Sequence, residues 1–535
     1  MNIAIKISVV EFILIVFACS VVFAQVWTPD LGNGKYKNPI IHADYSDPDV
    51  IRVEDDFYMT ASSFNCFPAL PILHSNDLVN WKIINHAINI FPDKDFDIPQ
   101  HGNGIWAPSL RYHQGEFWIF YGDSDRGIFM VKTRDIRGKW EPPVLVKKTK
   151  GWIDPCPLWD NDGAAYLVHA FAKSRAGINS ILHVNKLNPD GTRVLDEGTL
   201  VFDGHENHPT IEGPKFYKRN AYYYIFAPAG GVPNGWQTVL RSKNIYGPYQ
   251  NKIVLAQGNT DINGPHQGGY IELENGEGWF IHFQDREAYG RIVHLQPVVW
   301  KDDWPVIGQD KDDDGTGEPV PVFKKPDVGK LYPVLVPQTS DEFNFKNLGL
   351  QWQWHANYKK SWFSLTEKEN VLRLNSQNMP SDAINLWLVP NLLLQKFPAP
   401  EFTVTTKISF HGKVPDEKSG LIIMGQDYAF LALQKSKEGI ALVQVTCLNA
   451  NRRGKELVIE QVPVDSHTLY LRAAVEKEAL CNFSFSMDGK NFKPIGKPFA
   501  AKAGRWIGAK IGLFAVQPAS AKQGGYAEYD FFQVE

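Results

Sequence analysis

The chain has 535 residues, a formal net charge of −4 and an aromatic fraction of 13%. This length exceeds what one ordinary hydrophobic core organises, so two domains are expected. The small net charge and the absence of a long basic run argue against nucleic-acid binding and against electrostatic recruitment to a membrane. The aromatic residues can fill sheet cores, and a minority can also stack on sugar rings.

Residues 1–24 are predicted to be a secretory signal peptide. An apolar run, VVEFILIVFACSVVFA, precedes a small-residue site that predicts cleavage after Ala24. Cys19 lies in a weak lipoprotein-like context, which Phe17 fits poorly. We therefore expect an exported protein, periplasmic or extracellular, with anchoring through Cys19 as the less favoured alternative. No other segment has the run of about 18 apolar residues that spans a bilayer.

A short pattern occurs five times in the first 290 residues: an apolar strand, a tight polar turn and a second, more aromatic strand. The copies are DPDVIRVEDDFYMTAS, APSLRYHQGEFWIFYG, DPCPLWDNDGAAYLVHA, GPKFYKRNAYYYIFAPA and QGGYIELENGEGWFIHF. They recur at intervals of about 47 to 60 residues, which is typical of propeller blades or solenoids. Further strands follow the hairpins, as in LHSNDLVNW and KTRDIRGKW. The sequence therefore predicts a five-bladed β-propeller over residues 36–326.

Three acids, Asp47, Asp154 and Glu212, lie just before the first strand of a blade. In a propeller these points converge on one end of the central channel. Glycosidic bond cleavage needs a proton donor and a carboxylate that acts on the anomeric carbon or on a water beside it. Burial or a neighbouring negative charge keeps the donor protonated. One Asp-Pro pair is more simply a strand entrance, but three matched acids favour an active site.

The segment 304–326, rich in Asp, Gly and Pro, closes the propeller. Within it Asp310, Asp312, Asp314 and Gly315 imitate the start of a calcium-binding loop, but the twelfth position is Pro321 instead of glutamate. The pattern therefore favours an acidic surface turn.

From Leu331 onward the sequence alternates apolar and polar residues, as in FTVTTKISF, FLALQK and TLYLRAAV. Such stretches are typical of half-buried strands, and Asp488-Gly489 indicates a hairpin. A β-sandwich is predicted over residues 336–535. The mature chain has too few cysteines for a disulfide framework and no zinc-binding spacing. Either a Cys447–Cys481 bridge or free buried thiols fit this pattern.

The chain resembles glycoside hydrolase family 43, the α-L-arabinofuranosidase and β-xylosidase group, over essentially its whole mature length. The resemblance rests on the phrases NPIIHADYSDPDVIRVEDDFYMTASSF, GIWAPSLRYHQGEFWIFYG, WIDPCPLWDNDGAAYLVHA, IEGPKFYKRNAYYYIFAPAGG, NGPHQGGYIE and AYGRIVHLQPVVW. LGLQWQWHANY resembles the C-terminal domain of that family's β-xylosidases. The resemblance implies an all-β fold, a five-bladed propeller followed by a concanavalin-like jelly-roll sandwich.

The resemblance also assigns catalytic roles. Asp47 would be the general base that activates water, Glu212 the general acid, and Asp154 the carboxylate that tunes the pKa of Glu212. The family inverts the configuration at the anomeric carbon, so the resemblance implies a single displacement by water. It implies no cofactor for the chemistry. Asp44 and Asp49 flank Asp47 and could be mistaken for it.

Other positions carry weaker expectations. His266 matches a histidine at the channel centre that often lies near a calcium ion, and Arg291 matches a substrate-contacting position. The alternative for His266 is a buried core histidine, and the alternative for Arg291 is a surface ion pair. Trp106, Phe64 and Phe67 are candidates for the walls of the sugar site, although both phenylalanines could pack between blades.

These features predict an exo-acting, inverting enzyme that releases terminal pentoses from plant cell-wall oligosaccharides or polysaccharides. The β-xylosidases usually have an aromatic residue near position 66, where this chain has Cys66. For this reason α-L-arabinofuranosidase activity is expected first and β-xylosidase activity second. A non-catalytic carbohydrate-binding propeller and an endo-arabinanase are the alternatives.

Overall fold

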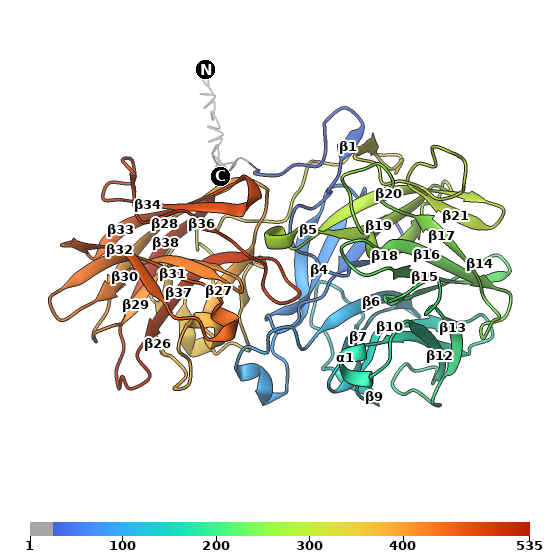
Figure 1. Ribbon diagram of the computed structural model, residues 1–535, viewed down its shortest axis with the longest axis horizontal. Coiled ribbons are helices and arrows are strands. Elements are labelled where there is room, and N and C mark those ends of the chain that lie inside the picture. Colours follow the sequence, from blue (N-terminus) through green and yellow to red (C-terminus); the bar gives the residue numbers. More distant parts are fainter. Residues whose placement is uncertain (1–24) are drawn as a thin grey trace, which may run out of the picture.

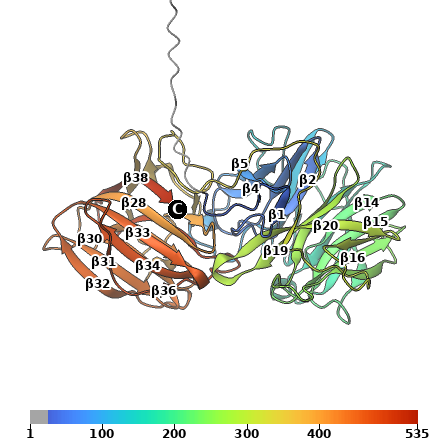
Figure 2. The same cartoon turned by 90° about the horizontal axis from the view of Figure 1, so that it is seen from above.

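The computed structural model describes residues 25–535, which form two all-β domains side by side (Figures 1 and 2). Residues 36–307 contribute five four-stranded sheets, and the C-terminal part contributes two eight-stranded sheets. The predicted fold class, a propeller followed by a sandwich, is confirmed. The predicted signal peptide and Cys19 lie outside the described residues. In residues 25–535, no helix has the length and apolar character needed to cross a bilayer.

Each blade is an antiparallel sheet whose four strands follow one another in the chain. The blades are β2 (Asp49–Val53), β3 (Asp56–Thr60), β4 (Ala69–Ser75) and β5 (Lys82–Ile88); β6 (Trp106–His113), β7 (Glu116–Asp123), β8 (Gly127–Thr133) and β9 (Val144–Lys148); β10 (Trp152–Trp159), β11 (Ala165–Phe171), β12 (Ile181–Leu187) and β13 (Thr199–Asp203); β14 (Lys215–Arg219), β15 (Tyr222–Ala229), β16 (Trp236–Ser242) and β17 (Gln250–Leu255); β18 (His266–Glu272), β19 (Gly278–Asp285), β20 (Arg291–Lys301) and β21 (Trp304–Ile307). Short helical segments connect some of them, namely η1 (Lys94–Asp97), α1 (Lys173–Ala176) and η2 (Glu287–Tyr289).

The aromatic strands are apolar on both faces because each blade packs between two others. In β7, Phe117, Ile119 and Tyr121 pack against the first blade, whereas Trp118 and Phe120 face the third. This period of two is the alternation expected of a strand. Each blade therefore needs both sides of its sheet buried, which accounts for the high aromatic content of the chain.

A left-handed residue lies at the start of each innermost strand, either just before it or within its first three residues. Its φ is 53° at Asp47, 31° at Ala107, 57° at Asp154, 57° at Gly213 and 35° at Gln267. Four of the five are not glycine, so each costs roughly 1–3 kcal/mol, and such residues concentrate at functional sites. Glycine occupies this position in the fourth blade. The acid of the fourth blade, Glu212, therefore precedes the left-handed position by one residue, whereas Asp47 and Asp154 occupy it. The prediction that the three acids hold matching positions is corrected accordingly.

The ring closes between the fifth and first blades. Strand β18 lies against β2, and a side chain at Gly269 would meet an Asp49 carboxylate oxygen at 2.7 Å. The first and last propeller segments also pair, as β1 (Lys35–Lys37) with β22 (Val322–Lys324). Asn38 donates to the carbonyls of Leu295 and Val320 at 2.8 and 2.7 Å. Closure therefore depends on contacts between the two ends of the domain.

The sandwich consists of two facing sheets. One contains β23 (Gln353–Trp354), β26 (Gln377–Asn378), β27 (Leu392–Lys396), β29 (Lys418–Met424), β30 (Tyr428–Lys435), β31 (Ile440–Cys447), β32 (Leu457–Val464) and β37 (Lys510–Gln517). The other contains β24 (Phe363–Ser364), β25 (Leu372–Asn375), β28 (Phe402–His411), β33 (Thr468–Glu476), β34 (Leu480–Ser486), β35 (Lys493–Pro494), β36 (Phe499–Ala500) and β38 (Tyr526–Val534). Connecting 3-10 turns are η3 (Lys360–Trp362), η4 (Leu386–Leu388), η5 (Ala450–Arg452) and η6 (Lys477–Ala479).

The cysteines of residues 25–535 are free and buried. Cys447 is in β31 and Cys481 is in β34, so they belong to different sheets and to different clusters of the core. The alternative of a Cys447–Cys481 bridge was therefore wrong, and the expectation of free buried thiols is confirmed.

The sandwich is attached to the first blade and its flanking loops. Phe67 and Trp354 exchange backbone hydrogen bonds across the interface, with N–O distances of 3.1 and 2.6 Å. The side chain of Asn357 bonds both backbone groups of Phe91, at 2.9 Å each. These contacts hold the two domains in one orientation.

Replacing Asn357 with alanine should leave both backbone groups of Phe91 unsatisfied in a buried position. We expect the free energy of unfolding to fall by about 1–3 kcal/mol, measured as a lower midpoint of thermal unfolding. Asn375→Ala, which removes one exposed bond inside the sandwich, should change it by no more than roughly 0.5 kcal/mol. Equal midpoints for the two variants would contradict this account of the interface.

Candidate active site

Three carboxyl groups meet at one end of the propeller channel. Asp47 and Asp154 are 3% and 2% exposed, and the side chain of Glu212 is 29% exposed. Asp47 and Asp154 have a left-handed backbone and lie at the start of their innermost strands. Glu212 directly precedes Gly213, the left-handed residue of the fourth blade. The channel mouth thus concentrates three acids from the first, third and fourth blades. We call these three residues the acid triad.

Asp47 is held by donors on both carboxylate oxygens. Ser46 and Ser62 donate their hydroxyls to Oδ2 at 2.9 and 2.6 Å. Arg291 donates to Oδ1 at 2.9 Å and also to the Ser46 hydroxyl at 2.6 Å. These hydrogen bonds fix the orientation of the Asp47 carboxyl group. The predicted substrate-binding residue Arg291 therefore also positions Asp47.

Glu212 and Asp154 have a different environment. Burial, together with the negative charges of Asp154 and Asp47, raises the pKa of Glu212 to about 8. Asp154 accepts a 2.7 Å hydrogen bond from the backbone N–H of Gly213, the residue next to Glu212. Burial also raises the pKa of Asp154, and the Gly213 bond opposes that shift. Glu212 therefore carries a proton at neutral pH, and Asp154 lies where it can control that proton.

Asp44 and Asp49 have structural contacts instead. Asp44 accepts the backbone N–H groups of Arg291 and Gly508 at 2.9 and 3.0 Å. Asp49 is 0% exposed and pairs with Arg111 at 2.7 Å. The flanking acids thus join chain segments, which leaves Asp47 as the acid of this stretch that faces the other two.

His266 is fully buried beside the acid triad. Its Nε2 lies 3.4 Å from the Oε1 of Glu212, and neither ring nitrogen has a hydrogen-bond partner. Burial lowers its pKa to about 3, so the imidazole is neutral. Calcium prefers six to eight oxygen ligands, and among residues 25–535 no cluster of three or more His, Cys, Asp or Glu side chains with metal-binding spacing includes His266. The orphaned nitrogens suit a water molecule, and the predicted ion there stays a prediction.

The predicted aromatic residues divide between the site and the interface. Trp106 is half-buried, lies 6.4 Å from Phe64 between ring centroids and donates its indole N–H to Gly102. Phe67 is 0% exposed, its ring packs on Phe91 and Phe96 of the propeller, and its backbone bonds Trp354 of the sandwich. The packing alternative holds for Phe67.

Cys66 also faces the interface. It is 1% exposed, and its sulfur accepts a hydrogen bond from Lys510 of the sandwich at 3.0 Å. A side chain at position 66 therefore points toward the second domain.

A loop of the sandwich, residues 503–508, reaches Arg291, the residue that bonds Asp47. Trp506 is 50% exposed, and the guanidinium of Arg291 lies 5.8 Å from its ring centroid. Both line a cavity of about 390 Å³ with Asp285 and Arg505. The sequence analysis did not identify this loop. Its signal is a tryptophan between glycines in AGRWIG, but only the fold shows which way the loop points.

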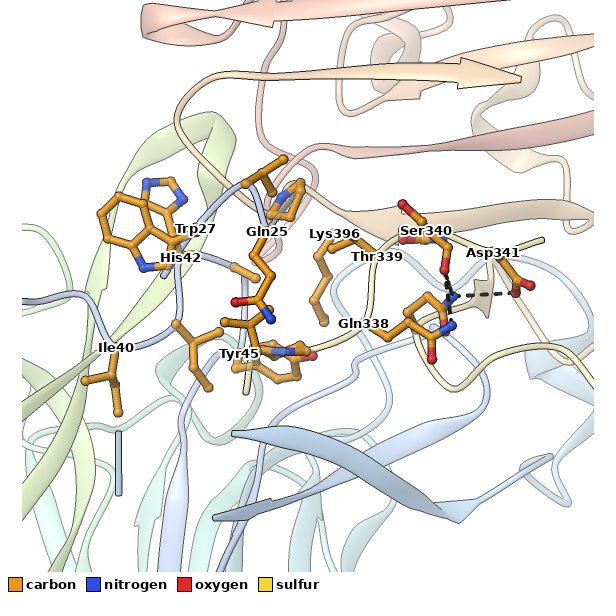
Figure 3. Close-up of a pocket in the computed structure, with 18 of the residues that line it drawn as sticks. Gln25, Trp27, Ile40, His42, Tyr45, Gln338, Thr339, Ser340, Asp341 and Lys396 are labelled. Carbon is orange, nitrogen blue, oxygen red and sulfur yellow. Dashed lines mark hydrogen bonds between the residues drawn. The ribbon is translucent and has the colours of Figure 1, made fainter. Parts of the chain in front are cut away.

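A second cavity, of about 340 Å³, lies between the N-terminal segment, the interdomain linker and the sandwich (Figure 3). Trp27, Tyr45 and Lys396 line it, and the Lys396 ammonium is 5.0 Å from the Tyr45 ring centroid. No residue of the acid triad lines it. This cavity is therefore separate from the acid triad.

The raised pKa of Glu212 gives a direct test of the site's electrostatics. Asp154→Asn removes a neighbouring negative charge, so the pKa of Glu212 should fall toward the value of an ordinary glutamate. Carbon-13 NMR titration of labelled glutamate carboxyls, assigned with Glu212→Gln, measures it. Asp162→Asn, in the exposed hairpin turn of the same blade, should leave the pKa unchanged. An unchanged pKa in Asp154→Asn would show that the two carboxyls do not interact.

Known proteins share this architecture. The family model "Glycosyl hydrolases family 43" matches residues 36–305, and "Beta xylosidase C-terminal Concanavalin A-like domain" matches residues 340–535. A Xylanibacter ruminicola protein, named as a candidate β-xylosidase, is 39% identical over 90% of this chain and 86% of its own length. A non-reducing end α-L-arabinofuranosidase of Bacteroides ovatus is 29% identical over 94% of this chain and 95% of its own length.

A crystal structure of a family 43 protein from Bacillus licheniformis superposes with a TM-score of 0.81 at 27% identity, covering 94% of this chain and 99% of that one. The match thus extends over both domains and includes the segments that carry the acid triad. This chain belongs to glycoside hydrolase family 43 and is a glycosidase.

Proposed function

We propose that this enzyme releases single pentoses from the non-reducing ends of xylose- or arabinose-containing oligosaccharides and polysaccharides, with inversion at the anomeric carbon. β-D-Xylose is the first candidate sugar, and α-L-arabinofuranose is the second. The observation that carries the proposal is the unequal environment of Asp47 and Glu212 at one channel mouth. One acid has a cation and two hydroxyl donors, while the other has a raised pKa.

In the proposed reaction Asp47 accepts a proton from water as the water oxygen attacks the anomeric carbon. Glu212 donates its proton to the glycosidic oxygen as the bond from that oxygen to the anomeric carbon breaks. Asp154 keeps Glu212 protonated and, through the N–H of Gly213, fixes the backbone beside it. Arg291 orients Asp47 and presents the rest of its guanidinium toward the cavity. No step requires a cofactor.

The sandwich supports exo action. Gly508 is anchored to Asp44, and the backbone N–H of Ala509 donates to the carbonyl of Ala288 at 2.7 Å. These bonds hold loop 503–508 at one side of the channel mouth, with Trp506 next to Arg291. An endo-acting enzyme needs a groove open at both ends. A wall on one side favours the removal of terminal residues.

The order of the two sugars differs from the expectation drawn from Cys66. That expectation assumed that position 66 contributes to binding of the leaving group, yet Cys66 is buried against Lys510. The relative named as a candidate β-xylosidase is also more similar to this chain than the arabinofuranosidase is. Both facts support β-D-xylose, and activity on both sugars is consistent with a shared pocket.

Hydrolysis of aryl β-D-xyloside and aryl α-L-arabinofuranoside by the wild type and Asp47→Asn tests the proposal. We expect turnover of the xyloside to exceed that of the arabinofuranoside. Asp47→Asn should lower both by about 10²–10⁴-fold, the range for a lost general base. Asp162→Asn serves as the control with the same change of charge. Proton NMR of the first product should show the inverted anomer, and a retained anomer would reject the single displacement.

Glu212→Gln should separate substrates by their leaving groups. Hydrolysis of xylobiose, which needs a proton on the departing oxygen, should fall by about 10²–10⁴-fold. Hydrolysis of a dinitrophenyl xyloside should fall much less, because its leaving group departs as an anion. Steady-state kcat/KM for the two substrates measures the difference. Equal losses on both would contradict the general-acid role.

A further inference from the structure

The acidic loop, residues 309–318, is held in a defined conformation. Gln309 and Glu318 exchange backbone hydrogen bonds of 2.9 Å at its base. Gly317 bonds the backbone of Val254 and Ala256 at 3.1 and 3.0 Å, which attaches the loop to the end of β17. Strand β21 immediately precedes the loop. The loop therefore connects the outermost strands of the fourth and fifth blades, away from the innermost strands that carry the acid triad.

Three carboxylates converge within this loop. One oxygen from each of Asp310, Asp312 and Asp314 lies within 4.8 Å of the others. Because calcium–oxygen distances are about 2.3–2.6 Å, two ligands of one ion are separated by up to about 5 Å. The spacing of the three oxygens therefore fits a shared calcium ion.

The charges of these three residues are incompletely compensated. The Asp310 side chain is 6% exposed, and its Oδ1 is buried without a hydrogen-bond partner. Its Oδ2 accepts the N–H of Gly315 at 3.1 Å and faces Lys301 at 3.6 Å. Lys301 is closer to Asp313, at 2.8 Å. Among the ion pairs of residues 25–535, none involves Asp312 or Asp314. A buried carboxylate oxygen without a donor is costly unless a cation binds it.

We propose that Asp310, Asp312 and Asp314 bind a calcium ion that joins the fourth and fifth blades. The order of residues, Asp-x-Asp-x-Asp-Gly, places carboxylates at the first, third and fifth positions and glycine at the sixth, as in calcium loops. Pro321 at the twelfth position cannot supply the usual bidentate carboxylate. The site should therefore bind in the range of extracellular modules, with Kd about 10⁻⁴–10⁻³ M. It is separate from the ion predicted near His266.

Thermal unfolding with calcium chloride as the probe tests the proposal. After treatment with EDTA and buffer exchange, calcium should raise the unfolding midpoint of the wild type, with half of the shift near the expected Kd. Asp312→Asn should abolish the shift below about 1 mM calcium, the upper end of that range. Asp312 is exposed, so this variant should fold without calcium. Asp302→Asn, an exposed residue of the adjacent hairpin, should keep the full shift.

A second measurement separates this site from the catalytic one. Isothermal titration with calcium should show one binding event that Asp312→Asn removes and Asp302→Asn retains. Hydrolysis of the aryl xyloside by Asp312→Asn at low temperature should equal that of the wild type. A midpoint shift or a binding event that survives in Asp312→Asn would place the ion elsewhere, such as near His266, and overturn the proposal. The absence of any shift in the wild type would overturn it as well.

Discussion

The acid triad lies in a channel mouth that water reaches poorly, where its three negative charges would repel one another strongly. Two charges about 4 Å apart interact several times more strongly at the effective dielectric constant of a protein than in water. The residues around the three acids differ in how they stabilise a negative charge. Asp47 receives the guanidinium of Arg291 and two serine hydroxyls. Glu212 is raised in pKa by burial and by the charges of Asp154 and Asp47, so it stays protonated. The proposed division into base and acid follows from this difference in environment.

The backbone around the channel is constrained as well. Asp47 and Asp154 both adopt a left-handed conformation, which an ordinary side chain avoids. The blades can hold this strain because each innermost strand belongs to a sheet that is buried on both faces. In the fourth blade glycine takes the strained position, and the acid moves to the preceding residue. Asp154 then bonds the N–H of that glycine, which couples the backbone turn of one blade to the carboxyl of another.

The sandwich is part of the catalytic apparatus and not a separate appendage. Asp44 of the propeller bonds backbone N–H groups of Arg291 and of Gly508 in the sandwich. Arg291 in turn contacts both Asp47 and Trp506. A change in the domain interface would therefore reach Asp47, the proposed general base, through only two side chains.

Much of the fold followed from local pattern. Alternating apolar strands, turn residues and a repeat of about 47 to 60 residues predict five blades and a sandwich, because strand periodicity and turn chemistry are properties of neighbouring residues. Three candidate acids were also predicted from the sequence, since each lies at the start of one of the repeats. The details of the site depended on contacts between distant residues. Arg291 and Asp47 are 244 residues apart, and Gly508 and Asp44 are 464 apart.

By itself the sequence determined the class of fold and the family, and it predicted three candidate acids. Only the tertiary structure decided that Phe67 and Cys66 belong to the interface, that Asp44 and Asp49 are structural, and that Trp506 stands beside Arg291. It also showed that one oxygen of Asp310 is buried without a donor. The physical reason is the same in each case. A side chain's role depends on which groups surround it, and here those groups come from other blades or from the other domain.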